Sequence, residues 1–397
     1  MVNRVTRSRQ LARDVIADGK SALDLMRQPV LLLWAIYILA TPLYIWRSGL
    51  PQPGDYLVIL IAPMALSAWN GRFSGPVVRT IRALGWFTVY VIVSNVVWTL
   101  ILQAYSLSLK HGFGLSPVFY IFNALVFIVV LALHQVHRRK LLHLTTTIVL
   151  ASLVLQVLIA SVLGGGGRRA TVLFNNPNQL GYYALLCASM LVLLQRRGFA
   201  NTLHVAIGTL CGTYLGLISA SKAALAGIVL LGVAGLVTRL RTAMVIVVAL
   251  FALLVLPSPM RDALERAMNR IATDESHGFV EERGYDRIEN HPEYWLLGSG
   301  EGAYQRFKDT TTIGAHEIHS SIGTLFFCYG IVGTLMFAAF LWRVLRGSGL
   351  ATWLLVTPSL AYGMTHQGLR FTMFWVLLAL IVALKTERGP PKPAAAR

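Results

Sequence analysis

Long apolar runs separated by short polar segments make up most of this chain. Each run approaches the roughly 20 residues that a helix needs to cross a bilayer. The pattern predicts twelve membrane-spanning helices, with approximate cores at residues 29–46, 56–70, 85–104, 117–135, 143–163, 180–195, 202–218, 223–238, 242–256, 320–342, 349–364 and 371–385. The predicted fold class is therefore an all-α polytopic membrane protein that forms one integral membrane domain over residues 1–397, with polar ends at 1–27 and 386–397. The last of these segments is expected to be disordered.

One polar segment, residues 257–319, interrupts this pattern. It holds 12 of the 17 acidic residues of the chain and ends where the apolar run at 320–342 begins. A membrane protein that collects its polar side chains in a single loop is expected to do its chemistry at that face of the bilayer. The loop is therefore the first place to look for a functional site.

Composition and charge agree with a membrane protein and argue against a nucleic-acid binder. Hydrophobic residues form 55% of the chain and charged residues 13%, against roughly 25% in soluble domains. The net charge is +18, but 22 of the 35 Lys and Arg residues lie in short segments on one side of the predicted spans. That bias places both termini in the cytoplasm and the loop 257–319 outside. The basic ends are expected to have some affinity for anionic lipid.

The candidate base is His319, at the end of the loop. A histidine at the water boundary of a membrane helix can accept or donate a proton near neutral pH. Gly330 and Gly333, three residues apart in the following span, would let another helix pack closely. An interfacial histidine without a chemical role is the alternative. His316 has metal-ligand spacing with His319, but no third ligand completes a site, so no metal is predicted.

Cationic side chains on the same face are candidates for binding phosphate. Arg283 and Arg287 are four residues apart and could share one face of a helical turn, where guanidinium groups bind phosphate or diphosphate by paired hydrogen bonds. Pairing with nearby acidic residues is the alternative. Lys222 lies between two apolar spans and is expected to face a partner or an aqueous cavity, although snorkelling would also explain it. Arg168 and Arg169 add further positive charge to this face.

Residues 164–181 are predicted to form irregular polar backbone at the outer face, which is tolerated at that depth where it lines a cavity. Asn178 or Asn176 could cap the next helix. His366 and Arg370, in the turn between the last two spans, are given a plain interfacial role.

The order of these motifs resembles the O-antigen ligase and polymerase superfamily of bacterial inner-membrane glycosyltransferases. The resemblance covers roughly residues 165–335. It rests on His319-Ser320 followed by Gly330 and Gly333, and on the stretches Phe174-Asn-Asn-Pro177-Asn178, Ser219-Ala-Ser-Lys222 and Trp295-Leu-Leu-Gly298-Ser-Gly300-Glu-Gly302. Twelve spans with one long periplasmic loop before the histidine fit the same family.

The resemblance implies a GT-C-like helical architecture and a transfer that needs neither metal nor cofactor. The donor would be a glycan on undecaprenyl diphosphate, used at the periplasmic face of the inner membrane. His319 falls on the essential histidine of the family, and Arg283 or Arg287 on its loop arginine. Lys222 falls where many members have arginine, so it keeps the charge and loses the forked geometry. The residues expected to support the site are Ser320, Asn178, Gly330, Gly333 and His316.

Transfer to lipid A-core, as by an O-antigen ligase, is the favoured reaction. The alternative within the superfamily is an O-antigen or exopolysaccharide polymerase, whose acceptor is a second lipid-linked glycan. A transporter of lipid-linked glycans is the alternative from another class, although it would need charges deep inside the spans. A non-enzymatic scaffold is a further alternative, and it would tolerate loss of His319.

Overall fold

A computed structural model describes residues 28–69, 71, 73–104, 116–163, 169–238, 244, 265, 279–307 and 316–387. All regular structure in these ranges is helical. The α-helices are α2 (Pro29–Ala40), α3 (Pro53–Ala68), α4 (Gly75–Ala104), α5 (Ser116–His137), α6 (Arg139–Leu163), α7 (Pro177–Arg196), α8 (Thr202–Ser219), α9 (Lys222–Thr238), α12 (Phe279–Arg283), α13 (Asp286–Asn290), α14 (Ser321–Leu345), α15 (Leu350–Tyr362) and α16 (Thr372–Thr386). The short 3-10 helices are η1 (Pro292–Tyr294), η2 (Tyr304–Phe307) and η3 (Gly368–Arg370).

The helices confirm the predicted all-α class and the multi-pass membrane character. Within the described ranges, α4, α5, α6, α7, α8 and α14 are long and apolar enough to cross a bilayer, and five further apolar helices are shorter. Eleven of the twelve predicted cores fall on these helices. The twelfth, 242–256, lies outside the described residues, as do the segments 1–27 and 388–397.

Sequence signals at the helix starts explain where several elements begin. Proline occupies the first position of α2, α3 and α7, where its missing N–H costs nothing. Asn176 caps α7 by accepting a hydrogen bond from the backbone N–H of Asn178, so Asn176 is the cap of the two candidates. Ser320 caps α14 in the same way.

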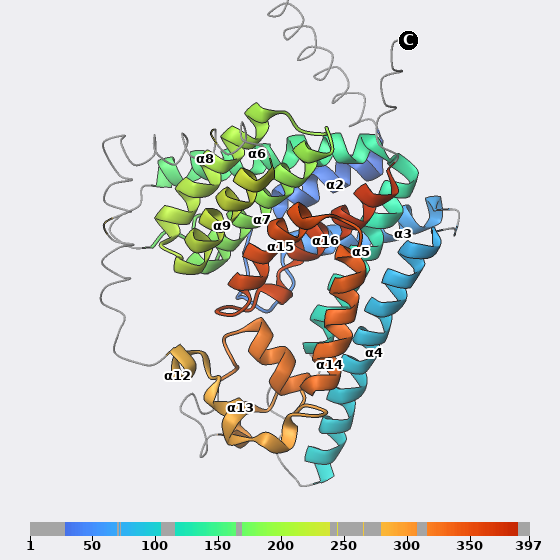
Figure 1. Ribbon diagram of the computed structural model, residues 1–397, viewed down its shortest axis with the longest axis vertical. Coiled ribbons are helices and arrows are strands. Elements are labelled where there is room, and N and C mark those ends of the chain that lie inside the picture. Colours follow the sequence, from blue (N-terminus) through green and yellow to red (C-terminus); the bar gives the residue numbers. More distant parts are fainter. Residues whose placement is uncertain are drawn as a thin grey trace, which may run out of the picture.

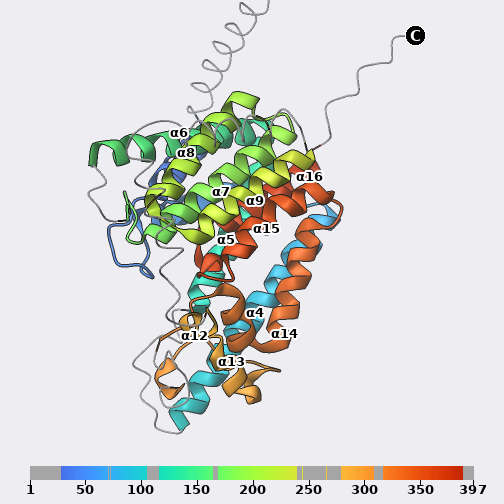
Figure 2. The ribbon, with the colours of Figure 1, turned by 60° about the vertical axis from the view of Figure 1, so that its left-hand side comes forward.

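Figures 1 and 2 show most helices gathered in the upper part of the molecule. Helices α4 and α14 pack together and lead down to α12 and α13, which belong to the long loop. The loop is therefore held at one end of the bundle.

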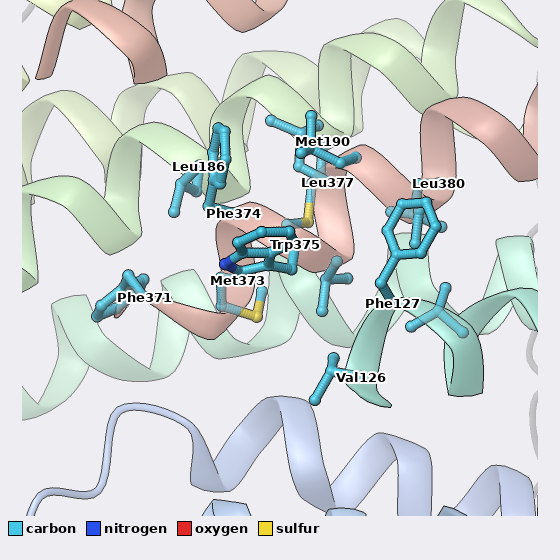
Figure 3. Packing of buried hydrophobic residues seen from close by; sticks show 14 of the residues in the cluster. Val126, Phe127, Leu186, Met190, Phe371, Met373, Phe374, Trp375, Leu377 and Leu380 are labelled. Carbon is cyan, nitrogen blue, oxygen red and sulfur yellow. The ribbon is translucent and has the colours of Figure 1, made fainter. Parts of the chain in front are cut away.

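Helix α16 forms the centre of the bundle. Every residue from Met373 to Leu384 is buried, as expected of a helix that is hydrophobic on all sides. Figure 3 shows its residues between Leu186 and Met190 of α7 and Phe127 of α5. The turn before α16 is therefore attached to a fully buried helix.

Close packing of α8 depends on glycines spaced four residues apart. A Cβ atom on Gly208 would lie 2.2 Å from a methyl carbon of Leu191 in α7, and one on Gly212 would lie 3.4 Å from the carbonyl oxygen of Ala184. A Cβ atom on Gly216 would lie 3.1 Å from Ile228 of α9. Small residues let helix backbones approach where lipid offers no hydrophobic driving force between helices.

The predicted span 320–342 is not one continuous helix. Helix α14 is broken at Gly330, which has φ 65° and ψ −171°, a conformation essentially restricted to glycine. The loop segment 295–300 fills the break: Ser299 and Gly300 donate to carbonyls of α14, while Trp295 and Leu296 accept from Ile331 and Val332. The interpretation of Gly330 as a helix-packing position is therefore wrong. Gly333 does face another helix, since its Cβ would lie 3.0 Å from Tyr90 of α4.

Candidate functional site

A polar cavity of about 340 Å³ lies where several helix ends meet. Its wall comes from the α2–α3 connection, the N-terminal ends of α5 and α7, residues 317 and 319, and the turn between α15 and α16. Charge bias assigns all of these to the same side of the predicted spans. The volume falls in the range of small-molecule sites.

His319 lines this cavity and its side chain is exposed. Its Nδ1 atom lies 2.8 Å from the carbonyl oxygen of Glu317. A carbonyl can only accept, so Nδ1 carries the proton and Nε2 of the neutral ring keeps its lone pair. Nε2 can then act as a proton acceptor.

The backbone around His319 is fixed from several directions. The His319 N–H donates to the carbonyl of Arg283 at 3.1 Å, and the Gln367 amide donates to the carbonyl of Ile318 at 2.5 Å. Ser320 Oγ donates to the carbonyl of Gly363 at 3.1 Å and forms a 2.7 Å hydrogen bond with the Tyr285 hydroxyl. Ser320 thus joins the loop, α14 and the end of α15.

Arg283 and Arg287 do not share one helical face. Gly284, with φ +76°, separates α12 from α13, and the two side chains bond to different partners. Arg283 donates to the carbonyl of Thr365 at 3.0 Å, beside the backbone of His319. Arg287 is fully buried and donates to the carbonyl of His316 at 2.7 Å, with its guanidinium 5.0 Å from the ring centre of Phe307.

The burial of Arg287 lowers its pKa from the usual arginine value. Neither arginine is among the residues that line the cavity, and His316 is exposed outside it. The structure therefore distinguishes the two loop arginines: Arg283 bonds to the backbone of His319, whereas Arg287 bonds to His316, outside the cavity.

Arg169 connects two of the motifs that sequence analysis singled out. Its Nε donates to the carbonyl of Ser219 at 2.9 Å, and Nη2 donates to Oδ1 of Asn178 at 2.6 Å. Asn178 lines the cavity and its carbonyl accepts from the Tyr362 hydroxyl at 2.9 Å. Thr365 in turn donates its N–H to the carbonyl of Tyr362 and accepts from Arg283 at its own carbonyl, so hydrogen bonds connect Arg169 and Arg283 to the same tyrosine from distant segments.

Lys222 is the first residue of α9, and its half-buried side chain is not among those that line the cavity. It lies three residues after Ser219, which Arg169 contacts. Arg168 lies outside the described residues.

The structure adds an ion-pair cluster that sequence analysis missed. Arg370 lies 2.5 Å from Oε1 of Glu301 and 2.8 Å from Oε2 of Glu317. Glu301 is fully buried and also accepts from the Tyr329 hydroxyl at 2.7 Å, while Asn95 accepts from its backbone N–H at 3.0 Å. Burial opposes the charge of Arg370, but the two carboxylates outweigh this and raise its pKa.

The only sequence signals for this cluster were Glu301 inside a glycine-rich turn and Arg370 at a span end. Neither signal identifies the other residue as its partner. Arg370 and Glu317 line the cavity, as does His366, so the interfacial role assigned to Arg370 and His366 is too narrow.

Two amide oxygens at the cavity wall lack a hydrogen-bond partner within the described residues. These are Oδ1 of Asn123, a residue only 1% exposed, and Oε1 of Gln179. Buried acceptors of this kind are usually satisfied. A ligand that donates hydroxyl hydrogens would satisfy both.

In the part of the chain that the structure describes, no group of three or more His, Cys, Asp or Glu side chains is placed to hold a metal ion. Neither a scan against models of protein families nor a search of curated proteins finds a match to the chain.

Proposed function

We propose that the protein is a glycosyltransferase that moves a glycan from undecaprenyl diphosphate to an acceptor hydroxyl in the His319 cavity. The preferred acceptor is lipid A-core, which would make the protein an O-antigen ligase. The observation that carries the proposal is the placement of His319: an exposed ring at a polar cavity, with Nδ1 at 2.8 Å from the carbonyl oxygen of Glu317, which leaves Nε2 for the acceptor. The motif resemblance supports the same reaction.

In the proposed step, Nε2 of His319 removes the proton from the acceptor hydroxyl as its oxygen attacks the anomeric carbon. The bond between that carbon and the diphosphate oxygen breaks, and its electron pair leaves with undecaprenyl diphosphate. Diphosphate is a good leaving group and departs without being protonated. Nearby positive charge would stabilise the negative charge that develops on it.

Arg169 and Arg283 are the proposed cations for the diphosphate. Hydrogen bonds connect both to Tyr362, Arg169 through Asn178 and Arg283 through Thr365, and a diphosphate beside this tyrosine is proposed to meet both. Lys222 and Arg168 are kept as additional candidates from the resemblance. Arg287 is proposed to stabilise the loop, because its guanidinium is enclosed by aromatic rings.

The unpartnered oxygens of Asn123 and Gln179 are the proposed contacts to sugar hydroxyls. Aromatic rings at the cavity wall, among them Phe119 and Phe371, offer apolar faces for a sugar ring. A polar cavity with both kinds of surface suits a carbohydrate better than an apolar solute.

The proposal includes a bacterial inner-membrane location, twelve spans of GT-C-like arrangement, cytoplasmic termini and a periplasmic cavity. Two observations support this arrangement. Lys and Arg are concentrated on one side of the predicted spans, and the helix ends on the other side meet around one cavity.

The test is transfer by purified full-length protein in nanodiscs. Undecaprenyl-diphosphate-linked glycan and lipid A-core are combined with and without EDTA, and wild type is compared with His319→Ala. Acceptor-dependent product that survives EDTA and falls at least about 100-fold in the variant is the expected result.

Longer lipid-linked chains without core modification would move the assignment to a polymerase. Full activity of a folded His319→Ala variant would overturn the mechanism. Transbilayer movement of the lipid-linked glycan without any transfer product would favour a transporter instead.

A further inference from the structure

A second site lies between α4 and α14, at the end of α14 far from His319. Two adjoining hollows of about 760 and 390 Å³ share Arg79, Ala339 and Arg343 as lining residues. We call them together the α4–α14 groove. The ends of both helices and of α16 that form it carry the basic residues assigned to the cytoplasmic side.

The head of the groove is strongly positive. Arg79, Arg82, Arg343 and Arg346 line it with exposed side chains, and no acidic residue is among its lining residues. Within the part of the chain that the structure describes, these four side chains make no ion pair or hydrogen bond. Arg79 and Arg343 line both hollows, Arg346 lines only the larger one and Arg82 only the smaller one. Like charges this close repel one another unless an anion lies between them.

A fifth cation, Lys385, is engaged differently. Its ammonium group donates to the carbonyl of Arg346 at 2.7 Å and to that of Val344, at the C-terminal end of α14. It therefore stabilises the helix end, where cations are favoured. The guanidinium groups of the four arginines therefore do not have to stabilise this helix end, because Lys385 already does so.

The rest of the groove is mostly apolar and exposed on the surface of the bundle. Ala83, Trp86, Met336 and Ala339 line the second hollow below the arginines, and the two alanines leave space between the helices. Only 28% of the apolar window of α4 is buried. Trp86 and Trp342 are 61% and 55% exposed, as tryptophans at membrane interfaces often are.

We propose that the α4–α14 groove binds one anionic phospholipid. Its phosphate headgroup would lie among Arg79, Arg82, Arg343 and Arg346, and the start of an acyl chain would lie against Ala83, Met336 and Ala339. Free phosphate could bind the same four arginines, but it would leave the apolar hollow empty. The inference does not depend on the proposed glycosyl transfer.

The first experiment measures fluorescence anisotropy of labelled phosphatidylglycerol with full-length protein in detergent micelles. Labelled phosphatidylcholine is the neutral comparison, and inorganic phosphate is the competitor. We expect saturable binding of one phosphatidylglycerol, much weaker binding of phosphatidylcholine, and no displacement by millimolar phosphate. Equal binding of the two lipids, or displacement by phosphate, would overturn the proposal.

A charge-matched pair of variants locates the site. Arg79→Gln with Arg343→Gln should weaken phosphatidylglycerol binding roughly tenfold or more, from about 1 kcal/mol for each cation near an anionic headgroup. Arg139→Gln with Lys140→Gln removes two charges from the same end of the bundle, at the start of α6, and should leave binding unchanged. Equal losses in both would mean a diffuse electrostatic effect and would contradict a defined groove.

Ala339→Trp tests the apolar half without changing charge. The exposed position accommodates a larger side chain, and the ring would fill the hollow. Binding of phosphatidylglycerol should fall several-fold while all four arginines remain. Unchanged binding by this variant, with an unchanged Tm, would show that no acyl chain occupies the hollow.

Discussion

At the level of single residues, two histidines three positions apart have different surroundings. His319 lines the cavity and bonds the carbonyl of Glu317, whereas His316 is exposed and contributes its own carbonyl to Arg287. Residue type alone did not separate them, since both carry the same ring in the same segment. Their hydrogen bonds do separate them: His319 bonds through its ring, whereas His316 bonds through its backbone carbonyl.

His319→Ala should therefore abolish transfer, with a loss of about 100-fold to 10,000-fold, because the only proposed base is removed. His316→Ala should retain activity near wild type, since its backbone carbonyl still accepts from Arg287. Initial rates of glycan transfer by the two purified variants check this. A similar loss in both would mean that His319 acts through the fold of the segment rather than as a base.

Substitution of Arg287 is expected to lower mainly the stability of the protein, whereas substitution of Arg283 is expected to lower mainly the rate of transfer. Arg287→Ala should destabilise the protein by about 2–4 kcal/mol, because it leaves the carbonyl of His316 unsatisfied and removes contacts between the guanidinium and aromatic rings. Arg283→Ala should cost at most about 1 kcal/mol and lower transfer roughly tenfold or more, from the lost diphosphate contact. Tm in detergent and transfer rates, measured on both variants, separate these effects.

Partial recovery of transfer in Arg283→Lys would support a role of its charge. An Arg283→Ala variant with wild-type kinetics at every donor concentration would remove Arg283 from the proposed site.

At the level of elements, the break in α14 determines how the long loop attaches to the bundle. The segment 295–300 uses the backbone groups that the break at Gly330 leaves without helical partners. A Cβ atom on Gly330 would lie 2.3 Å from the carbonyl oxygen of Leu296. Of the two glycines after His319, Gly330 thus allows the loop to contact α14, and Gly333 allows α4 to pack against it.

Gly330→Ala should be severely destabilising and should also lower transfer, because the loop would have to move away from α14. Gly198→Ala is the matched control: it also has positive φ, +82°, but a Cβ there meets nothing within 4 Å. The control should lose only about 1–2 kcal/mol, from backbone strain alone. Equal Tm losses for the two variants would mean that the close approach at Gly330 contributes nothing.

At the level of the whole molecule, Arg370 connects parts of the chain that are far apart in sequence. It bridges Glu301 of the loop and Glu317 before α14, and its own turn leads into the buried helix α16. The cavity wall is therefore attached to the core through a buried ion-pair cluster.

Arg370→Gln should destabilise the protein by about 3–5 kcal/mol, since it leaves the buried carboxylate of Glu301 without its cation. The double variant Arg370→Gln with Glu301→Gln should recover part of this loss, because no uncompensated charge remains. A double-mutant cycle on Tm measures the coupling. Additive effects of the two substitutions would mean that the ion pair does not hold the loop.

Much of the fold followed from the sequence, because hydropathy acts locally. Runs of apolar residues near 20 in length must become helices in a bilayer, where every backbone group needs an internal partner. The predicted cores therefore fall on observed helices wherever the structure describes them, although α2 ends at Ala40 and α14 is broken at Gly330. The charge bias likewise grouped His319, Asn178 and Arg169 on one side before any contact was known.

Tertiary structure alone decided which of these residues meet. The positive φ of Gly284 ends one helix between Arg283 and Arg287. The four-residue spacing of the two arginines suggested a shared helical face and could not reveal this break. The partnership of Arg370 with Glu301 joins residues 69 positions apart, and it exists because the bundle buries the carboxylate of Glu301 beside Arg370. Composition and periodicity determine which segments enter the membrane, whereas a site depends on contacts between segments that the chain specifies only after it has packed.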